Sequence, residues 1–270
     1  MPTIAENRNL WNETYTWGDN GEDWSLPFGN SEAAWWFMLL PRIHRYLPAE
    51  TILEIAPGGG RWTQFLKDHC RKLIGVDLAE RCVARCRERF ALEPHLSFYL
   101  NDGKSLPMIA DQSIDLAFSF DSLVHVGEDA IEPYLHELAR VLKADGVGVI
   151  HYSNFGAFAR RMKIVRLQNR LRGPLKKLFS AGKVEFLLGV HLGWWDQRMT
   201  ANRFLKICEE AGLCCLTQET INWVGSKSTV GAICVISRTG SRWERDMRTL
   251  ANSEYMRNAA LVARLAKLYC

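Results

Sequence analysis

The 270-residue chain contains no uninterrupted run of about 18 apolar residues, the length that a membrane-spanning helix requires. Its N-terminus also lacks the basic stretch followed by an apolar stretch that marks a secretory signal peptide. Eight cysteines are present, but no C-x-x-C pair and no zinc-binding spacing occurs among them. The sequence therefore predicts a cytoplasmic protein with free thiols, without a membrane-spanning helix and without a structural zinc site.

Acidic residues are missing from one stretch of the chain. Between Arg160 and Lys183 there are nine Lys and Arg residues and no Asp or Glu, so the excess of positive charge comes from this segment. Leucine and isoleucine recur there at helical spacing, and Gly173-Pro174 is expected to break the helix in two. Three interpretations stay open: a lid with solvated charges, a grip on an anionic substrate, or peripheral contact of residues 158–183 with an anionic membrane.

The most informative stretch that is present covers residues 51–60, Thr-Ile-Leu-Glu-Ile-Ala-Pro-Gly-Gly-Gly. An apolar run ends in three glycines, and residues 61–66 then read as the start of a helix. Glycine lets the backbone approach a ligand, and a helix N-terminus offers unpaired N–H groups, so this pattern predicts a nucleotide-cofactor site. A second apolar run ends at Asp77, whose carboxylate is placed to accept both ribose hydroxyls of an adenosine cofactor.

Two families open in this way. The dinucleotide fingerprint G-x-G-x-x-G/A is met by Gly58 and Gly60, but Thr63 stands at the third position, where helix and strand pack closely. Residues 54–60 resemble instead the first motif of the class I S-adenosylmethionine (SAM)-dependent methyltransferases, an acidic residue and a loop that ends G-x-G. Ala56 replaces the usual first glycine of that loop.

Later segments support the same resemblance, which covers residues 51–153 and 199–237. Residues 96–100 read as a third strand, followed by Asn101-Asp102-Gly103, and residues 113–120 read as a fourth strand. A helix over about 131–142 and the sequence Lys143-Ala144-Asp145-Gly146 then precede an apolar strand, which is typical of this family. Residues 213–215 and 230–236 resemble its closing antiparallel pair.

The resemblance implies an α/β fold with a Rossmann-like, seven-stranded, mostly parallel sheet, an N-terminal helical extension and a helical lid insertion. We expect a tryptophan-rich helical extension over 1–50, the SAM-binding core over 51–153, the basic lid over 154–198, the closing part of the sheet over 199–240 and a C-terminal helix over 241–270. The extension should hold one helix over 4–14 and a second from Ser31, as N-cap, to about Tyr46. Its tryptophans either wall the substrate pocket or fasten the helices to the core, and the C-terminal helix packs on the core or forms a subunit contact.

Methyl transfer from SAM is an in-line displacement that needs a closely held acceptor and, for a hydroxyl acceptor, a general base. In this fold the acceptor lies beyond the ends of the fourth and fifth strands, which suggests His125 or His151 as the base. Asp121 is expected to orient a histidine, to hold the SAM amino group or to join a metal site, although the sequence has no obvious carboxylate cluster for a metal. The cofactor-binding residues that the resemblance implies are Glu54, Ala56, Gly58, Gly60, Trp62, Asp77, Leu78, Asn101, Asp102, Gly103 and Phe120.

The leading hypothesis for function is SAM-dependent O-methylation of a sugar-containing or polyhydroxylated acceptor, either a small molecule or a glycan. A natural-product O- or N-methyltransferase is the nearest alternative, and a non-catalytic cofactor-binding module is an alternative of another class. Nucleic acid is not expected as a partner, because Ser119-Phe120-Asp121-Ser122 stands where amino-methylating DNA enzymes carry an N-P-P-Y type motif.

Overall fold

A computed structural model describes residues 3–159, 195–223 and 228–269. The predicted basic helices and most of the predicted lid therefore lie outside the described residues. Within the described residues, no helix has both the length and the hydrophobicity needed to cross a bilayer. The seven cysteines in this part of the chain are free thiols, as the sequence predicted.

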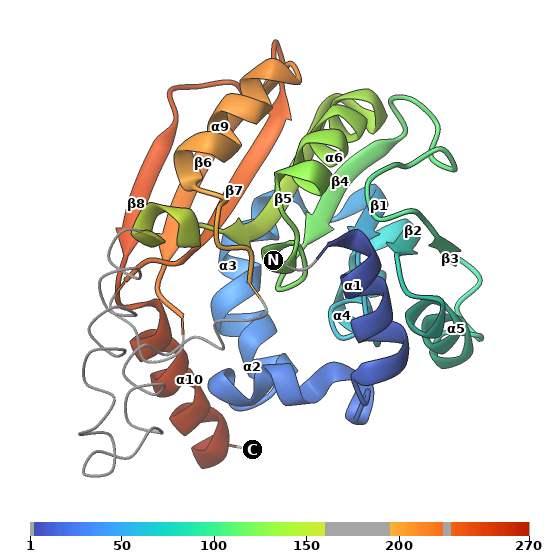
Figure 1. The fold of residues 1–270 in the computed structure, drawn as a ribbon. Coiled ribbons are helices and arrows are strands. Elements are labelled where there is room, and N and C mark those ends of the chain that lie inside the picture. Colours follow the sequence, from blue (N-terminus) through green and yellow to red (C-terminus); the bar gives the residue numbers. More distant parts are fainter. Residues whose placement is uncertain (1–2, 160–194, 224–227, 270) are drawn as a thin grey trace.

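An eight-stranded sheet forms the centre of the molecule, in the order β3-β2-β1-β4-β5-β7-β6-β8 (Figure 1). The first five strands in this order run parallel, β7 runs antiparallel to both β5 and β6, and β8 runs parallel to β6. The Rossmann-like sheet is thus confirmed, with eight strands where seven were expected. The strands are β1 Ala49–Ile55, β2 Cys70–Asp77, β3 Leu96–Leu100, β4 Ile114–Ser119, β5 Leu142–Ser153, β6 Leu213–Ile221, β7 Gly231–Arg238 and β8 Arg248–Asn252.

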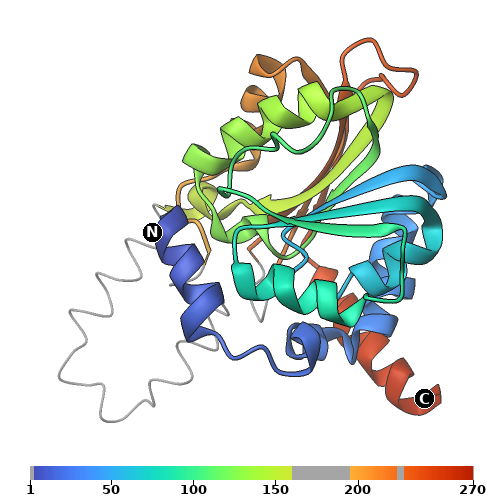
Figure 2. The same ribbon diagram turned by 90° about the vertical axis from the view of Figure 1, so that its right-hand side faces the viewer.

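Helices cover both faces of the sheet, because neighbouring residues of each buried strand point to opposite sides (Figure 2). Ile52 belongs to one apolar cluster and Leu53 to the other. The cluster of Leu53 packs under α6 (Glu128–Val141) and α9 (Ala201–Glu210). The cluster of Ile52 packs under α4 (Thr63–Leu66), α5 (Glu80–Arg89) and α10 (Tyr255–Tyr269). The sheet is therefore the middle of three layers.

The N-terminal extension is helical, as predicted. α1 (Ile4–Asn9) continues into a π-helical turn over Leu10–Thr14, and a 3₁₀ segment covers Asp19–Phe28. A second helical stretch joins α2 (Ser31–Ala34), a π-helical turn (Trp35–Leu39), α3 (Leu40–Ile43) and a final 3₁₀ turn (His44–Tyr46). Its N-cap is Asn30, whose side chain accepts a hydrogen bond from Ala33 N, so the choice of Ser31 was one residue late.

The predicted C-terminal helix over 241–270 is wrong in its first half. Residues 248–252 form β8, an edge strand whose main chain pairs with Thr217–Ile221 of β6, and the helix begins only at Tyr255. Leu250 is 58% exposed, so its helical spacing from Trp243 and Met247 does not reflect a buried helix face. Main-chain pairing with the open edge of β6 determines the conformation of residues 248–252. The spacing of apolar side chains does not indicate such pairing.

The three glycines after β1 are close-packed on several sides. A Cβ atom at Gly58 would lie 2.6 Å from the Trp17 ring, and one at Gly59 would lie 2.6 Å from the main-chain carbonyl of Asn20. One at Gly60 would lie 2.5 Å from the Phe90 ring. Residues 17–24, which we call the strap, therefore rest directly on the glycine turn.

We predict that Gly59→Ala displaces the strap, because its φ is not left-handed and the added methyl group clashes with fixed main-chain atoms. The free energy of unfolding should fall by about 1–3 kcal/mol, and tryptophan fluorescence should report a more exposed Trp17. Gly18→Ala is the matched control within the strap, since a Cβ there meets nothing within 4 Å. Equal unfolding free energies for the two variants would contradict this packing.

A second prediction concerns Glu219 on β6, which receives Arg42 Nε at 2.7 Å and Asn252 Nδ2 at 2.7 Å. Burial alone would raise the pKa of Glu219, but its hydrogen bonds and ion pair with Arg42 outweigh this and lower the pKa. The pair therefore stabilises the fold above the ordinary glutamate pKa, and this contribution is lost as the pH falls through the lowered value. Glu219→Gln should reduce the unfolding free energy at pH 7 by about 1–3 kcal/mol, and urea unfolding at about pH 3 should show a smaller difference from the wild type.

Candidate active site

The turn after β1 adopts left-handed backbone angles. Ala56 has φ +57°, Gly58 +59° and Gly60 +82°. Glycine takes such angles without strain, whereas at Ala56 they carry a cost that the surrounding contacts must offset. The Ala56 N–H donates to the Val76 carbonyl at 2.7 Å, which ties the turn to β2. The sequence thus builds a fixed backbone cradle at the ends of two neighbouring strands.

A cavity of about 850 Å³, open mouth included, lies over this turn. Its walls come from the glycine turn, from the ends of β2 and β4 with the segments after them, and from the N-terminal extension. The lining residues are Asn7, Trp11, Trp17, Gly21, Trp24, Ala56, Pro57, Gly58, Gly59, Arg61, Trp62, Asp77, Leu78, Cys82, Gly103, Phe120, Asp121, Ser122, Leu123, His125, Val126 and Tyr134.

Asp77 lines the cavity at the end of β2, as expected. Its carboxylate accepts hydrogen bonds from Gly58 N at 3.1 Å and Ala79 N at 2.8 Å. Burial raises the pKa of Asp77 to about 6, and hydrogen bonds from the main chain oppose that rise. An added hydrogen-bond donor at this carboxylate would favour its charged form. The carboxylate is therefore suited to accept hydrogen bonds from the hydroxyl groups of a ligand.

Glu54 lies beneath the turn and outside the cavity lining. Thr63 Oγ1 donates to its Oε2 at 2.6 Å, while Oε1 has no hydrogen-bond partner within the described part of the chain. Burial raises the pKa of Glu54 to about 7. Thr63, which counted against a dinucleotide site in the sequence, here anchors the acidic residue of the motif. Gly60 is also absent from the lining, because its open side faces Phe90.

The structure does not bring the Asp102 carboxylate into the cavity. Asp102 is exposed, and its Oδ1 accepts the Lys104 and Ser105 N–H groups at 3.0 and 2.7 Å. The neighbouring Asn101 is buried and donates to the Tyr134 hydroxyl at 2.8 Å, and Tyr134 and Gly103 line the cavity. Asp102 therefore shapes the loop, while its neighbours approach the ligand space.

A buried ion pair stands at the other end of the cavity. Arg61 Nη2 lies 3.0 Å from Asp121 Oδ2, with side chains only 9% and 4% exposed. Asp121 has the left-handed angle φ +64°. Burial raises the pKa of Asp121, and the Arg61 charge opposes this rise. The sequence analysis did not include Arg61 among the site residues, although its position directly after the three glycines could have indicated a role there.

The two candidate histidines occupy different environments. His125 lines the cavity, and its ring centroid lies 5.3 Å from that of Trp11. Its main chain is held by Ser122 O and by the Asn7 side chain. His151 is fully buried and outside the lining, stacked behind Phe120 with ring centroids 4.6 Å apart. Burial lowers the pKa of His151 to about 3.

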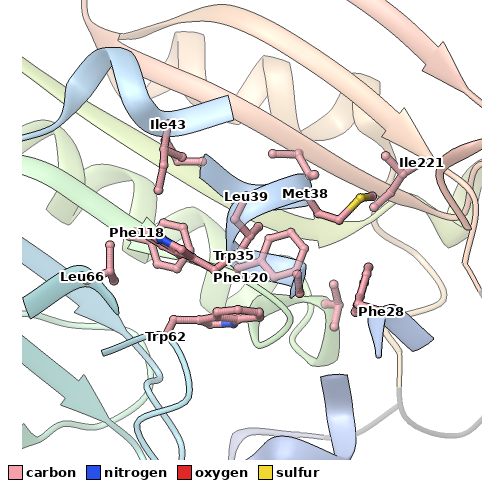
Figure 3. Close-up of a cluster of buried hydrophobic side chains, with 14 of the residues drawn as sticks. Phe28, Trp35, Met38, Leu39, Ile43, Trp62, Leu66, Phe118, Phe120 and Ile221 are labelled. Carbon is pink, nitrogen blue, oxygen red and sulfur yellow. The ribbon is translucent and has the colours of Figure 1, made fainter. Parts of the chain in front are cut away.

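Aromatic rings of the extension make a wall of the cavity. Trp11, Trp17 and Trp24 line it, and Tyr15 packs among them with its ring centroid 4.9 Å from that of Trp17. Trp35 is buried instead in the core, so the tryptophans of this segment divide between the cavity wall and the core. Trp62 and Phe120 also line the cavity. Their rings meet edge to face, with centroids 5.8 Å apart (Figure 3).

The matches to known proteins agree with this geometry. Residues 52–146 match the family described as a methyltransferase domain. A probable S-adenosylmethionine-dependent methyltransferase of Mycolicibacterium smegmatis is 27% identical over 130 residues, which cover 47% of this chain and 48% of that protein. The chain thus spans about half the length of this curated relative.

Two solved structures share the fold. The PH0226 protein from Pyrococcus horikoshii OT3 has a TM-score of 0.55 at 15% identity, covering 86% of this chain and 96% of that one. A geranyl diphosphate methyltransferase in complex with SAM has a TM-score of 0.54 at 12% identity, covering 78% and 86%. These two likenesses show the fold. The methyltransferase domain matched by residues 52–146, together with the glycine turn, the Asp77 carboxylate and the cavity over them, identifies this part of the chain as a class I SAM-dependent methyltransferase domain.

Proposed function

We propose that the protein transfers the methyl group of SAM to a hydroxyl of a polyhydroxylated or sugar-containing small molecule or glycan. The observation that carries this proposal is that three tryptophans and His125 line the same cavity as the glycine turn. Indole rings stack on the apolar C–H faces of sugar rings, and polar groups beside them fix the orientation. A hydroxyl acceptor also gives His125 a proton to remove.

The cavity residues suit the two ends of the cofactor. Asp77 is placed to accept the ribose hydroxyls, while Leu78, Gly103 and Tyr134 enclose the adenosine end. The Arg61–Asp121 pair offers one positive and one negative group, which match the carboxylate and the ammonium of the methionine end. When bound, SAM supplies an electrophilic methyl group on a sulfonium.

The protein residues then act on the acceptor. The tryptophan wall excludes water and holds the acceptor at the methionine end of the cavity. The acceptor hydroxyl would then lie close to the methyl group, so that the displacement would behave as a unimolecular step. His125 would take the hydroxyl proton on an imidazole nitrogen, while the methyl group passed from the sulfonium sulfur to the acceptor oxygen and S-adenosylhomocysteine left. Proximity and proton removal are thus the two contributions of this chain.

Methylation of an amine is the second candidate, and the same aromatic wall supports it. Aromatic faces attract cations, and Trp11, Trp17 and Trp24 stand in one cavity with Asp121. An ammonium acceptor would still have to lose a proton before its nitrogen could attack, so the aromatic cage would bind the cation and a base would be needed as well. The predicted membrane contact of residues 158–183 depends almost wholly on residues outside the described part of the chain, so it does not enter this proposal.

The proposal is tested by measuring S-adenosylhomocysteine release with a panel of methyl glycosides, oligosaccharides and small amines. We expect turnover with at least one sugar and a new methyl ether in the product by mass spectrometry. Turnover restricted to the amines would contradict sugar O-methylation and support the second candidate.

We predict that His125→Ala lowers turnover of a sugar acceptor about a hundredfold and leaves S-adenosylhomocysteine affinity nearly unchanged by calorimetry. Added imidazole should restore part of the rate. His125→Gln is the matched control for ring volume and polarity, since glutamine cannot take up the proton at neutral pH. Wild-type turnover in both variants would remove His125 from the mechanism.

A further inference from the structure

His151 stands at the end of β5 inside a shell of aromatic rings. Phe120 stacks on one side, and the centroids of Trp195 and Trp223 lie 5.7 and 5.5 Å from that of His151. Phe120 lines the cavity, whereas His151 does not. A substrate in the cavity therefore meets the Phe120 ring before it can meet the imidazole.

One hydrogen bond joins His151 to the cavity wall. The Asp121 N–H donates to His151 Nδ1 at 3.2 Å. This bond falls at the residue with the left-handed φ of +64°, a conformation that an aspartate adopts at a cost. The Asp121 backbone is thus held from behind by His151, and its carboxylate is held from the side by Arg61.

The same bond fixes the proton on the ring. Because Nδ1 accepts, the neutral imidazole must carry its proton on Nε2. Nε2 is buried without a hydrogen-bond partner among the described residues. The positive charges of Arg61 and Arg42, and that of His125 when it is protonated, also disfavour a second proton on the ring. With burial, they lower the pKa of His151 to about 3, so the ring stays neutral at physiological pH.

We propose that His151 is a positioning residue and not the general base: its Nδ1 fixes the left-handed turn at Asp121 and so directs the Asp121 carboxylate, together with Arg61, at the amino-acid end of SAM. This inference rests on the proposed role of Asp121 and Arg61 in holding that end of the cofactor. It makes His125 the one candidate base of the two histidines that faces the cavity.

The test uses S-adenosylhomocysteine binding to the full chain, with two variants that separate the roles. His151→Asn keeps an acceptor, Oδ1, near the position of Nδ1, whereas His151→Phe keeps the ring and removes the acceptor. We expect affinity within about threefold of the wild type for His151→Asn and at least about a tenfold loss for His151→Phe. Equal affinity in the wild type and both variants would overturn the proposal.

Turnover separates this proposal from the function on which it rests. His151→Asn cannot act as a base, so wild-type turnover with an unchanged pH profile supports positioning, and a hundredfold loss with normal cofactor affinity overturns it in favour of a base. The role of His125 is tested independently by its own variants. If no sugar is methylated, or if the His125 variants keep wild-type turnover, the test by S-adenosylhomocysteine binding is therefore unaffected.

A measurement on the unmodified protein covers the case in which His151→Phe does not fold. Nitrogen-15 NMR should show Nδ1 of His151 unprotonated and Nε2 protonated, with no change between about pH 5 and pH 8. A titration of this ring with a midpoint near the ordinary histidine value would contradict the fixed tautomer and the proposal with it.

Discussion

The site depends on the close approach of two main-chain segments, the glycine turn and the strap. Gly59 has no room for a methyl group because the Asn20 carbonyl fills it, and Gly58 meets the Trp17 ring in the same way. Side chains of α5 fasten this arrangement from the other side, since Arg85 donates to Asn20 Oδ1 and Arg89 to the Gly59 carbonyl. The strap is thus held over the cavity by Gly58 and Gly59, which themselves line the cavity.

The site also gathers buried charges. Three carboxylates around this contact, Glu54, Asp77 and Asp121, are largely removed from water, and burial raises the pKa of each. The compensating groups are few: Thr63 beneath the turn, main-chain N–H groups at Asp77 and Arg61 at Asp121. Carboxylates with remaining capacity to accept hydrogen bonds gain more from a ligand's donors than solvated ones would. This arrangement of carboxylates suits a polar cofactor.

The sequence predicted the parts of this arrangement that repeat a local pattern. The strand, glycine turn and Asp77 were found because their spacing is fixed by one crossover unit. β8 was wrongly predicted to be helical, and the orientation of the Asp102 carboxylate was not predicted, for a different reason. Asp102 turns its carboxylate to two N–H groups of its own loop, and β8 forms because β6 offers an open edge. The pairing of Arg61 with Asp121 and the packing of the strap on the glycine turn were not predicted, because contacts between distant segments leave no periodic trace.

The sequence also could not distinguish His125 from His151 as a candidate base, whereas their positions in the fold do. Both follow strand ends, and both were equal candidates for the base. The fold separates them by a single ring, since Phe120 stands between His151 and the cavity while His125 lies open to it beside Trp11. A base must exchange protons with its substrate, and a positioning group must keep the proton that it has. Burial behind Phe120 suits the second task, so the roles proposed for the two histidines follow from the side of the Phe120 ring that each one occupies.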